Sequence, residues 1–88
     1  MQKILIYSSN RCPFCTMAKR LLEQRGLNYS EINVDSEPHL REEMMKKTNR
    51  RTVPQIYIGD YHVGGFNELH ALDQSKKLDA LLVTDSKN

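Results

Sequence analysis

The sequence predicts an α/β fold in which helices flank a four-stranded mixed sheet, and three observations carry this prediction. Short apolar runs alternate with segments of helical periodicity. Turn residues separate these segments at short intervals, and no linker divides the 88 residues into two domains. No internal repeat or low-complexity run is present. We therefore expect one domain over residues 1–88, in the order βαβαββα, with a short C-terminal helix and a polar tail at 83–88.

The first unit is a strand, a loop and a helix. Residues 4–7 are apolar at successive positions, as in a strand that is covered on both faces. Pro13 suits the first position of a helix, apolar residues then recur with helical spacing, and Gly26 can cap the helix end. A second strand over 29–34 follows this helix. Because the connection is a helical crossover, the second strand should lie parallel to the first.

The second half of the chain predicts a helix, a hairpin and two further helices. Residues 36–47 begin with helix-start residues and carry a narrow apolar stripe. The apolar segments 55–58 and 61–63 flank Gly59-Asp60, a two-residue connection that fits a type II′ hairpin between antiparallel strands. Asn67 is a candidate N-cap for the next helix. The leucine-rich stretch before the tail predicts the last short helix.

Composition excludes several classes of function. Thirteen basic and eleven acidic residues give a net charge of +2, too small a field for strong non-specific binding to nucleic acid or membranes. Two cysteines are too few for a four-cysteine zinc module or a multi-bridge secreted scaffold. The apolar run near the N-terminus is far shorter than a signal peptide or a membrane span requires. We expect a soluble, cytoplasmic protein.

The two cysteines, Cys12 and Cys15, have the C-x-x-C spacing and lie where the first strand passes into its helix. Cys12 falls at or next to the N-cap, where first-turn N–H groups and the helix dipole stabilise an anion. This placement should depress the pKa of Cys12 rather than that of Cys15. A thiolate of low pKa is also the better leaving group from a mixed disulfide. The spacing and position indicate thiol–disulfide exchange with unequal roles for the two sulfurs.

Two structural alternatives remain for this pair. A permanent Cys12–Cys15 bridge would close so short a loop that it stabilises the fold by only about 2 kcal/mol. A zinc site needs two more ligands, and the three histidines lack the H-x₃₋₅-H spacing. Redox exchange is the better interpretation, and we expect no metal.

Three stretches together resemble a known family: Cys12-Pro13-Phe14-Cys15, Thr52-Val53-Pro54-Gln55 and residues 64–69. The chain resembles the dithiol glutaredoxins, most closely the short bacterial ones, over about residues 3–82. The resemblance implies a thioredoxin-like fold. It also implies glutathione-dependent reduction of protein disulfides and protein–glutathione mixed disulfides, with Cys12 as nucleophile and leaving group and Cys15 as the resolving cysteine.

The resemblance further implies a glutathione site and a cis peptide bond before Pro54. Lys46 matches a position that faces the glycine carboxylate of glutathione, although a solvated helix end is the ordinary interpretation of such basic residues. The N–H groups of Phe66 and Asn67 suit the γ-glutamyl carboxylate. The candidate glutathione residues are Arg11, Phe14, Lys46, Arg51, Thr52, Val53, Pro54, Gly65, Phe66 and Asn67.

Three positions depart from the family pattern. Phe14 replaces a tyrosine, Ser9 stands where a basic residue is common, and Asn67 stands where many relatives have an aspartate. Two rival functions stay open: recycling by thioredoxin reductase, and a glutathione-ligated iron–sulfur carrier, which Pro13 disfavours. The expected partners are glutathione, as reducing co-substrate, and disulfide-bonded or glutathionylated proteins, with ribonucleotide reductase suggested by family analogy. Nucleic acid and membranes are not expected as partners, and the protein should be a monomer.

Overall fold

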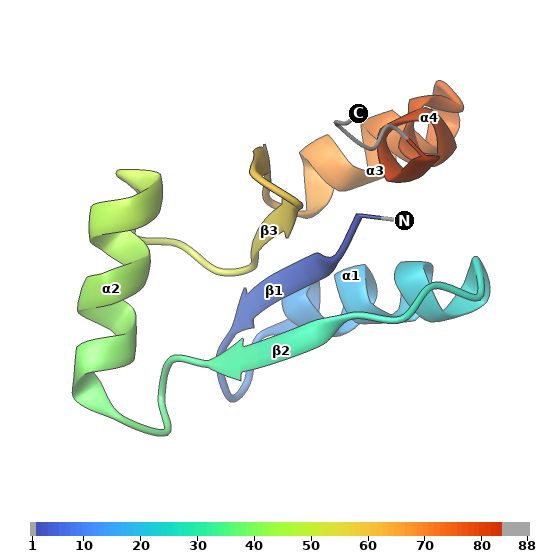
Figure 1. Cartoon of the computed structure of the whole chain (residues 1–88). Coiled ribbons are helices and arrows are strands. Elements are labelled where there is room, and N and C mark those ends of the chain that lie inside the picture. Colours follow the sequence, from blue (N-terminus) through green and yellow to red (C-terminus); the bar gives the residue numbers. More distant parts are fainter. Residues whose placement is uncertain (1, 84–88) are drawn as a thin grey trace.

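The computed structural model describes residues 2–83 and has the predicted order of elements (Figure 1). A single four-stranded sheet has the order β2-β1-β3-β4 within these residues. Of the tail expected at 83–88, Val83 instead ends the last helix, and 84–88 lie outside the described residues. The elements are β1 (Ile4–Ser8), α1 (Pro13–Gln24), β2 (Ser30–Asn33), α2 (Pro38–Thr48), β3 (Gln55–Ile58), β4 (Tyr61–Gly64), α3 (Phe66–Gln74) and α4 (Lys77–Val83).

The sheet is mixed, as predicted. β1 runs parallel to β2, because the helical crossover α1 returns the chain in the same direction, and antiparallel to β3. β3 and β4 form the predicted antiparallel hairpin. Gly59 has φ +59, while Asp60 is not among the described residues with positive φ, a combination that fits the predicted type II′ turn.

The two faces of the sheet carry separate apolar clusters. Alternate residues of β1 point to opposite faces, so Ile6 packs beneath α1, α3 and α4 while Tyr7 packs with Met44 of α2. Figure 1 shows α2 standing apart from the other three helices. This two-sided burial explains why residues 4–7 are apolar at successive positions. On the face of the sheet that α1, α3 and α4 cover, Arg25 joins the end of α1 to α3 through two hydrogen bonds of 2.7 Å to Asp73.

The predicted N-cap of α3 is wrong. The cap is Gly65, and the helix begins at Phe66, which places Asn67 within the first turn. The Glu68 carboxylate accepts a hydrogen bond of 2.6 Å from the Gly65 N–H and so satisfies the backbone at the helix start. Because Asn67 is already the second helical residue, its side chain cannot act as the N-cap.

Candidate active site

The two cysteines occupy the unequal positions that the sequence predicts. Cys12 is the N-cap of α1 and is half-buried, whereas Cys15 is only 1% exposed. They are joined as a disulfide with their Cα atoms 5.2 Å apart. The Cys15 N–H donates to Cys12 Sγ over 3.1 Å. When the bridge is reduced, this N–H and the open first turn of α1 favour a thiolate at Cys12 over one at Cys15.

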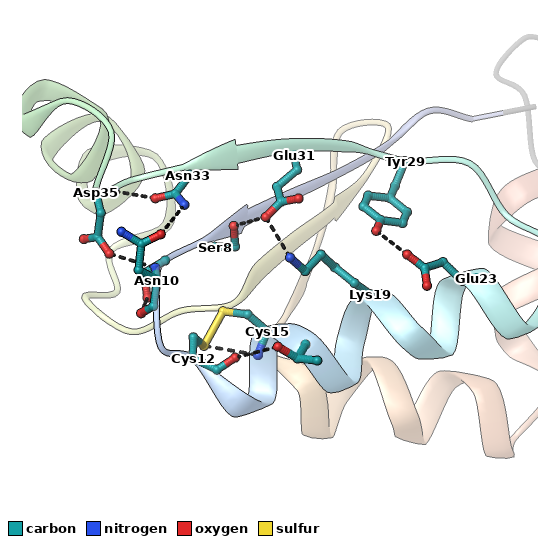
Figure 2. A network of polar contacts seen from close by, with 12 residues as sticks. Ser8, Asn10, Cys12, Cys15, Lys19, Glu23, Tyr29, Glu31, Asn33 and Asp35 are labelled. Carbon is teal, nitrogen blue, oxygen red and sulfur yellow. Dashed lines mark hydrogen bonds and ion pairs between the residues drawn. A yellow bond between two sulfur atoms is a disulfide. The ribbon is translucent and has the colours of Figure 1, made fainter.

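A polar network holds the loop between β1 and α1, which carries Cys12 (Figure 2). The Asn10 N–H donates to Asp35 Oδ2 over 2.8 Å, and Asn33 Nδ2 donates to Asn10 Oδ1 over 3.0 Å. These bonds tie the loop to the end of β2. Arg11, which directly precedes Cys12, has φ +54, an uncommon conformation for a residue with a side chain. The chain therefore turns sharply just before the redox centre.

A polar hollow of about 500 Å³ is lined by both cysteines and by residues of this network. Glu31 accepts hydrogen bonds here from Ser8 Oγ and from Lys19 Nζ, the latter over 3.0 Å (Figure 2). The Ser8 hydrogen bond, followed by that from Lys19, lowers the pKa of Glu31, so the carboxylate is ionised at neutral pH. Arg11 lines this hollow. Most of the other residues predicted to bind glutathione line a different hollow.

A second, smaller hollow of about 150 Å³ gathers most of the predicted glutathione residues. It lies between the loop that precedes β3 and the start of α3. Seven of the predicted residues line it: Phe14, Thr52, Val53, Pro54, Gly65, Phe66 and Asn67. Three further lining residues were not predicted: Arg50, Gln55 and Glu68. We call this hollow the aromatic pocket, because Phe14 and Phe66 form one wall, with ring centroids 6.2 Å apart.

The loop that precedes β3 connects this pocket with the redox centre. The Val53–Pro54 peptide bond is cis, as the resemblance implies. The Val53 carbonyl oxygen lies 3.7 Å from Cys12 Sγ. In the disulfide Sγ carries no proton, so this approach is a contact rather than a hydrogen bond. Val53 therefore lines the pocket and also contacts the reactive sulfur.

The start of α3 accommodates the Glu68 side chain because two glycines precede it. A Cβ on Gly64 would lie 2.8 Å from Glu68 Oε1, and Gly64 has φ +112, which side chains rarely adopt. The two glycines let Glu68 fold back onto the helix start. The N–H groups of Phe66 and Asn67 then lie in the first turn, where backbone donors attract an anion.

The basic residues near the pocket are divided between two neighbouring hollows. Lys46 and Arg51 line a neighbouring hollow, and Arg50 is the residue shared by that hollow and the aromatic pocket. Arg50 Nη1 lies 3.9 Å from Glu68 Oε1, so both signs of charge face the pocket. Asn49, in the left-handed conformation with φ 58, ends α2 and redirects the chain at this point. The sequence offered only a run of basic residues and no signal to separate Arg50 from its neighbours.

Comparison with known proteins decides the family. The family model described as glutaredoxin matches residues 4–63, which include the cysteine pair and the cis-proline loop. The chain belongs to the glutaredoxin family. A glutaredoxin of Pseudomonas aeruginosa is 49% identical, with 93% of this chain and 98% of the relative covered. Glutaredoxin 3 of Escherichia coli is 44% identical, with 93% and 99% covered.

Solved structures confirm the thioredoxin-like glutaredoxin fold. Glutaredoxin from Brucella melitensis has a TM-score of 0.83 at 45% identity, with 93% of this chain and 89% of that chain covered. A buckwheat glutaredoxin–glutathione complex has a TM-score of 0.84 at 28% identity, with 92% and 76% covered. The glutaredoxin described here is accordingly a thiol–disulfide oxidoreductase with a C-x-x-C redox pair. The use of glutathione is a property of its family.

No helix within residues 2–83 is long and apolar enough to cross a membrane. Over the same part of the chain, no group of three or more histidine, cysteine, aspartate or glutamate side chains is arranged to hold a metal ion.

Proposed function

We propose that this glutaredoxin reduces protein–glutathione mixed disulfides and protein disulfides with glutathione, and that the aromatic pocket holds the glutathione moiety. One observation carries the proposal: the loop that lines the pocket reaches within 3.7 Å of Cys12 Sγ through the Val53 carbonyl. A tripeptide held there would present its sulfur to Cys12. Holding the ligand sulfur beside Cys12 would replace a bimolecular encounter with an oriented one.

The chemistry of the pocket fits a zwitterionic tripeptide. The first-turn N–H groups of Phe66 and Asn67 suit the γ-glutamyl carboxylate. The Glu68 carboxylate lines the same wall and supplies a negative group for the ligand ammonium, beside the neutral amide of Asn67. The backbone of Val53 suits an extended peptide that adds as a short strand.

The glycine carboxylate of the ligand would point toward the end of α2. Arg50 faces the pocket, and Lys46 and Arg51 line the hollow that Arg50 shares with it. These three side chains supply a positive field at that end of the site. Arg11 lines the polar hollow beside Cys12 and remains a candidate for contact with glutathione from that side.

In the monothiol reaction, the Cys12 thiolate attacks the glutathione sulfur of a glutathionylated protein. The S–S bond between the substrate protein and glutathione breaks, the protein thiolate leaves and takes up a proton, and a Cys12–glutathione disulfide forms. A second glutathione, as thiolate, attacks the bound glutathione sulfur and releases oxidised glutathione and the Cys12 thiolate. The Cys15 N–H, 3.1 Å from Cys12 Sγ, stabilises the charge on the departing Cys12.

In the dithiol reaction, Cys12 attacks one sulfur of a protein disulfide and the first protein thiolate leaves. Cys15, as thiolate, then attacks Cys12 Sγ, the second protein thiolate leaves, and the Cys12–Cys15 disulfide forms. This product is the bridge that the structure contains. Two glutathione molecules then reduce it and leave as oxidised glutathione.

Activity in a hydroxyethyl-disulfide assay, coupled to glutathione and glutathione reductase, tests this proposal. Cys12→Ser should be inactive, whereas Cys15→Ser should retain reduction of mixed disulfides and lose reduction of protein disulfides. Glutathione should recycle the wild-type protein, and thioredoxin reductase should not. Full activity of Cys12→Ser, or recycling by thioredoxin reductase alone, would contradict the proposal.

The cellular setting forms part of the same proposal. We propose a cytoplasmic monomer that acts on disulfide-bonded or glutathionylated proteins, with ribonucleotide reductase as the protein substrate suggested by family analogy. Size-exclusion chromatography tests whether the protein is a monomer in solution. A coloured dimer after anaerobic purification would favour the iron–sulfur alternative instead.

A further inference from the structure

A buried glutamine stands behind the aromatic pocket. Gln55 follows the cis-proline, and its side chain is 0% exposed. Its Nε2 donates to the Thr52 carbonyl oxygen over 3.0 Å and lies 3.3 Å from Thr52 Oγ1. Because a carbonyl oxygen can only accept, this contact fixes which end of the amide faces Thr52. The amide oxygen of Gln55 therefore points the other way and needs a donor.

His62 of β4 is that donor. Its Nε2 lies 2.7 Å from Gln55 Oε1, and this geometry requires the proton of the imidazole on Nε2. The ring is further held by stacking on Tyr57, with centroids 4.9 Å apart. A chain of contacts thus runs from β4 through Gln55 of β3 to Thr52 in the pocket wall.

The surroundings of His62 keep the imidazole neutral. Burial lowers the pKa of His62, the positive charge of Arg50 lowers it further, and the carboxylate of Glu68 partly opposes both effects. At neutral pH the ring is therefore an uncharged donor. Its contact with Gln55 needs only the Nε2 proton and no charge.

We propose that His62 is a positioning residue for glutathione: it orients Gln55, and Gln55 fixes Thr52 and with it the backbone of the Thr52–Pro54 loop. This inference rests on the proposed function, because it assumes that glutathione binds along this loop. Without the donor, Gln55 Oε1 is left buried and unsatisfied, and the amide is free to rotate away from Thr52. The loop would then be less ordered before the ligand binds. The free-energy cost of ordering it on binding would weaken the affinity for the ligand.

Replacing His62 with Phe removes the donor and keeps a ring to stack on Tyr57. With a glutathionylated peptide as substrate, the KM should rise about fivefold, which corresponds to roughly 1 kcal/mol, the usual contribution of one hydrogen bond. The kcat should stay within about twofold, because the Cys15 N–H still supports Cys12. His62→Gln offers an amide N–H and should restore most of the affinity.

His39→Phe is the matched control, since His39 is exposed on α2 and contacts Glu37 rather than the pocket. It should leave the KM unchanged. Nuclear magnetic resonance gives a second readout: the Gln55 side-chain amide protons should exchange slowly in the wild type and faster in His62→Phe. Should His62→Phe fail to fold, His62→Leu removes the same donor.

Two results would overturn the inference: a KM within twofold of the wild type in a folded donor-free variant, or a raised KM that His62→Gln leaves fully unrestored. Failure of the proposed function looks different. In that case the wild-type protein itself would show no preference for a glutathionylated peptide over the same peptide linked to cysteamine.

Discussion

Gly64→Ala is the substitution for which the structure gives the most definite expectation. The added Cβ would lie 2.8 Å from Glu68 Oε1. Gly64 also has φ +112, outside the conformations that L-residues favour, which costs about 2 kcal/mol. The Glu68 side chain can move away, but it then loses its bond to the Gly65 N–H at the start of α3, worth about 1 kcal/mol. The free energy of unfolding should fall by about 3 kcal/mol.

Gly26→Ala provides the matched control. Gly26 has φ +70, but a Cβ there would have no neighbour within 4 Å. Only the left-handed backbone then opposes the substitution, at about 1 kcal/mol. Gly26 also lies at the far end of α1 from the cysteines, so activity should be unaffected.

Urea denaturation of the three proteins, followed by circular dichroism, measures the difference. Because Gly64→Ala displaces Glu68 from the pocket wall, it should also raise the KM for a glutathionylated peptide, whereas Gly26→Ala should not. A loss in Gly64→Ala that exceeds the loss in Gly26→Ala by only about 1 kcal/mol, the difference expected from the two backbone conformations, would show that the contact with Glu68 carries no energy. Unchanged KM in Gly64→Ala would show that the position of Glu68 does not matter for the ligand.

Three further predictions follow from the described contacts. The hydrogen bond from Arg25 lowers the pKa of Asp73 below its usual 3.8, so the pair stabilises the fold above that pH and the benefit disappears as the pH falls below it. Asp73→Asn should therefore lower the Tm at pH 7 and leave it nearly unchanged near pH 2; a Tm loss of equal size at both values would contradict this. Phe14→Ala removes one wall of the pocket and should raise the KM for a glutathionylated peptide about fivefold, measured under saturating glutathione; an unchanged KM would place the ligand elsewhere. Arg50→Ala should raise the same KM more than Lys46→Ala does, since Arg50 faces the pocket, and the reverse order would move the carboxylate site toward α2.

Local sequence patterns were sufficient to predict most of the fold. Pro13 and Gly26 mark the two ends of α1, and Gly59 sets the hairpin, because each of these residues restricts or frees φ where the backbone needs it. The position of the cysteine pair could also be predicted, because Pro13 marks the first residue of α1 and so places Cys12 at its N-cap. The start of α3 was predicted too late, because Asn67 is a common N-cap residue whereas the actual cap, Gly65, has no side chain to mark it.

The missing parts of the site depend on tertiary contacts. Gln55 is a polar residue of a type usually found at the surface, and its burial follows only from the partners on β4 and in the Thr52 loop. Arg50 could not be separated from Lys46 by sequence, because the left-handed turn at Asn49 decides which basic side chain faces the pocket. A run of basic residues in the sequence does not show which of their side chains faces the pocket.

The most direct test of the central claim is to locate glutathione on the protein. The Cys15→Ser protein, loaded as the Cys12–glutathione disulfide, can be studied by nuclear magnetic resonance for contacts between the tripeptide and the protein. We predict nuclear Overhauser effects from glutathione to the rings of Phe14 and Phe66, with shifts at the amides of Val53 and Asn67. Contacts confined to Arg11 and Lys19, in the polar hollow on the Glu31 side, would contradict the assignment of the aromatic pocket.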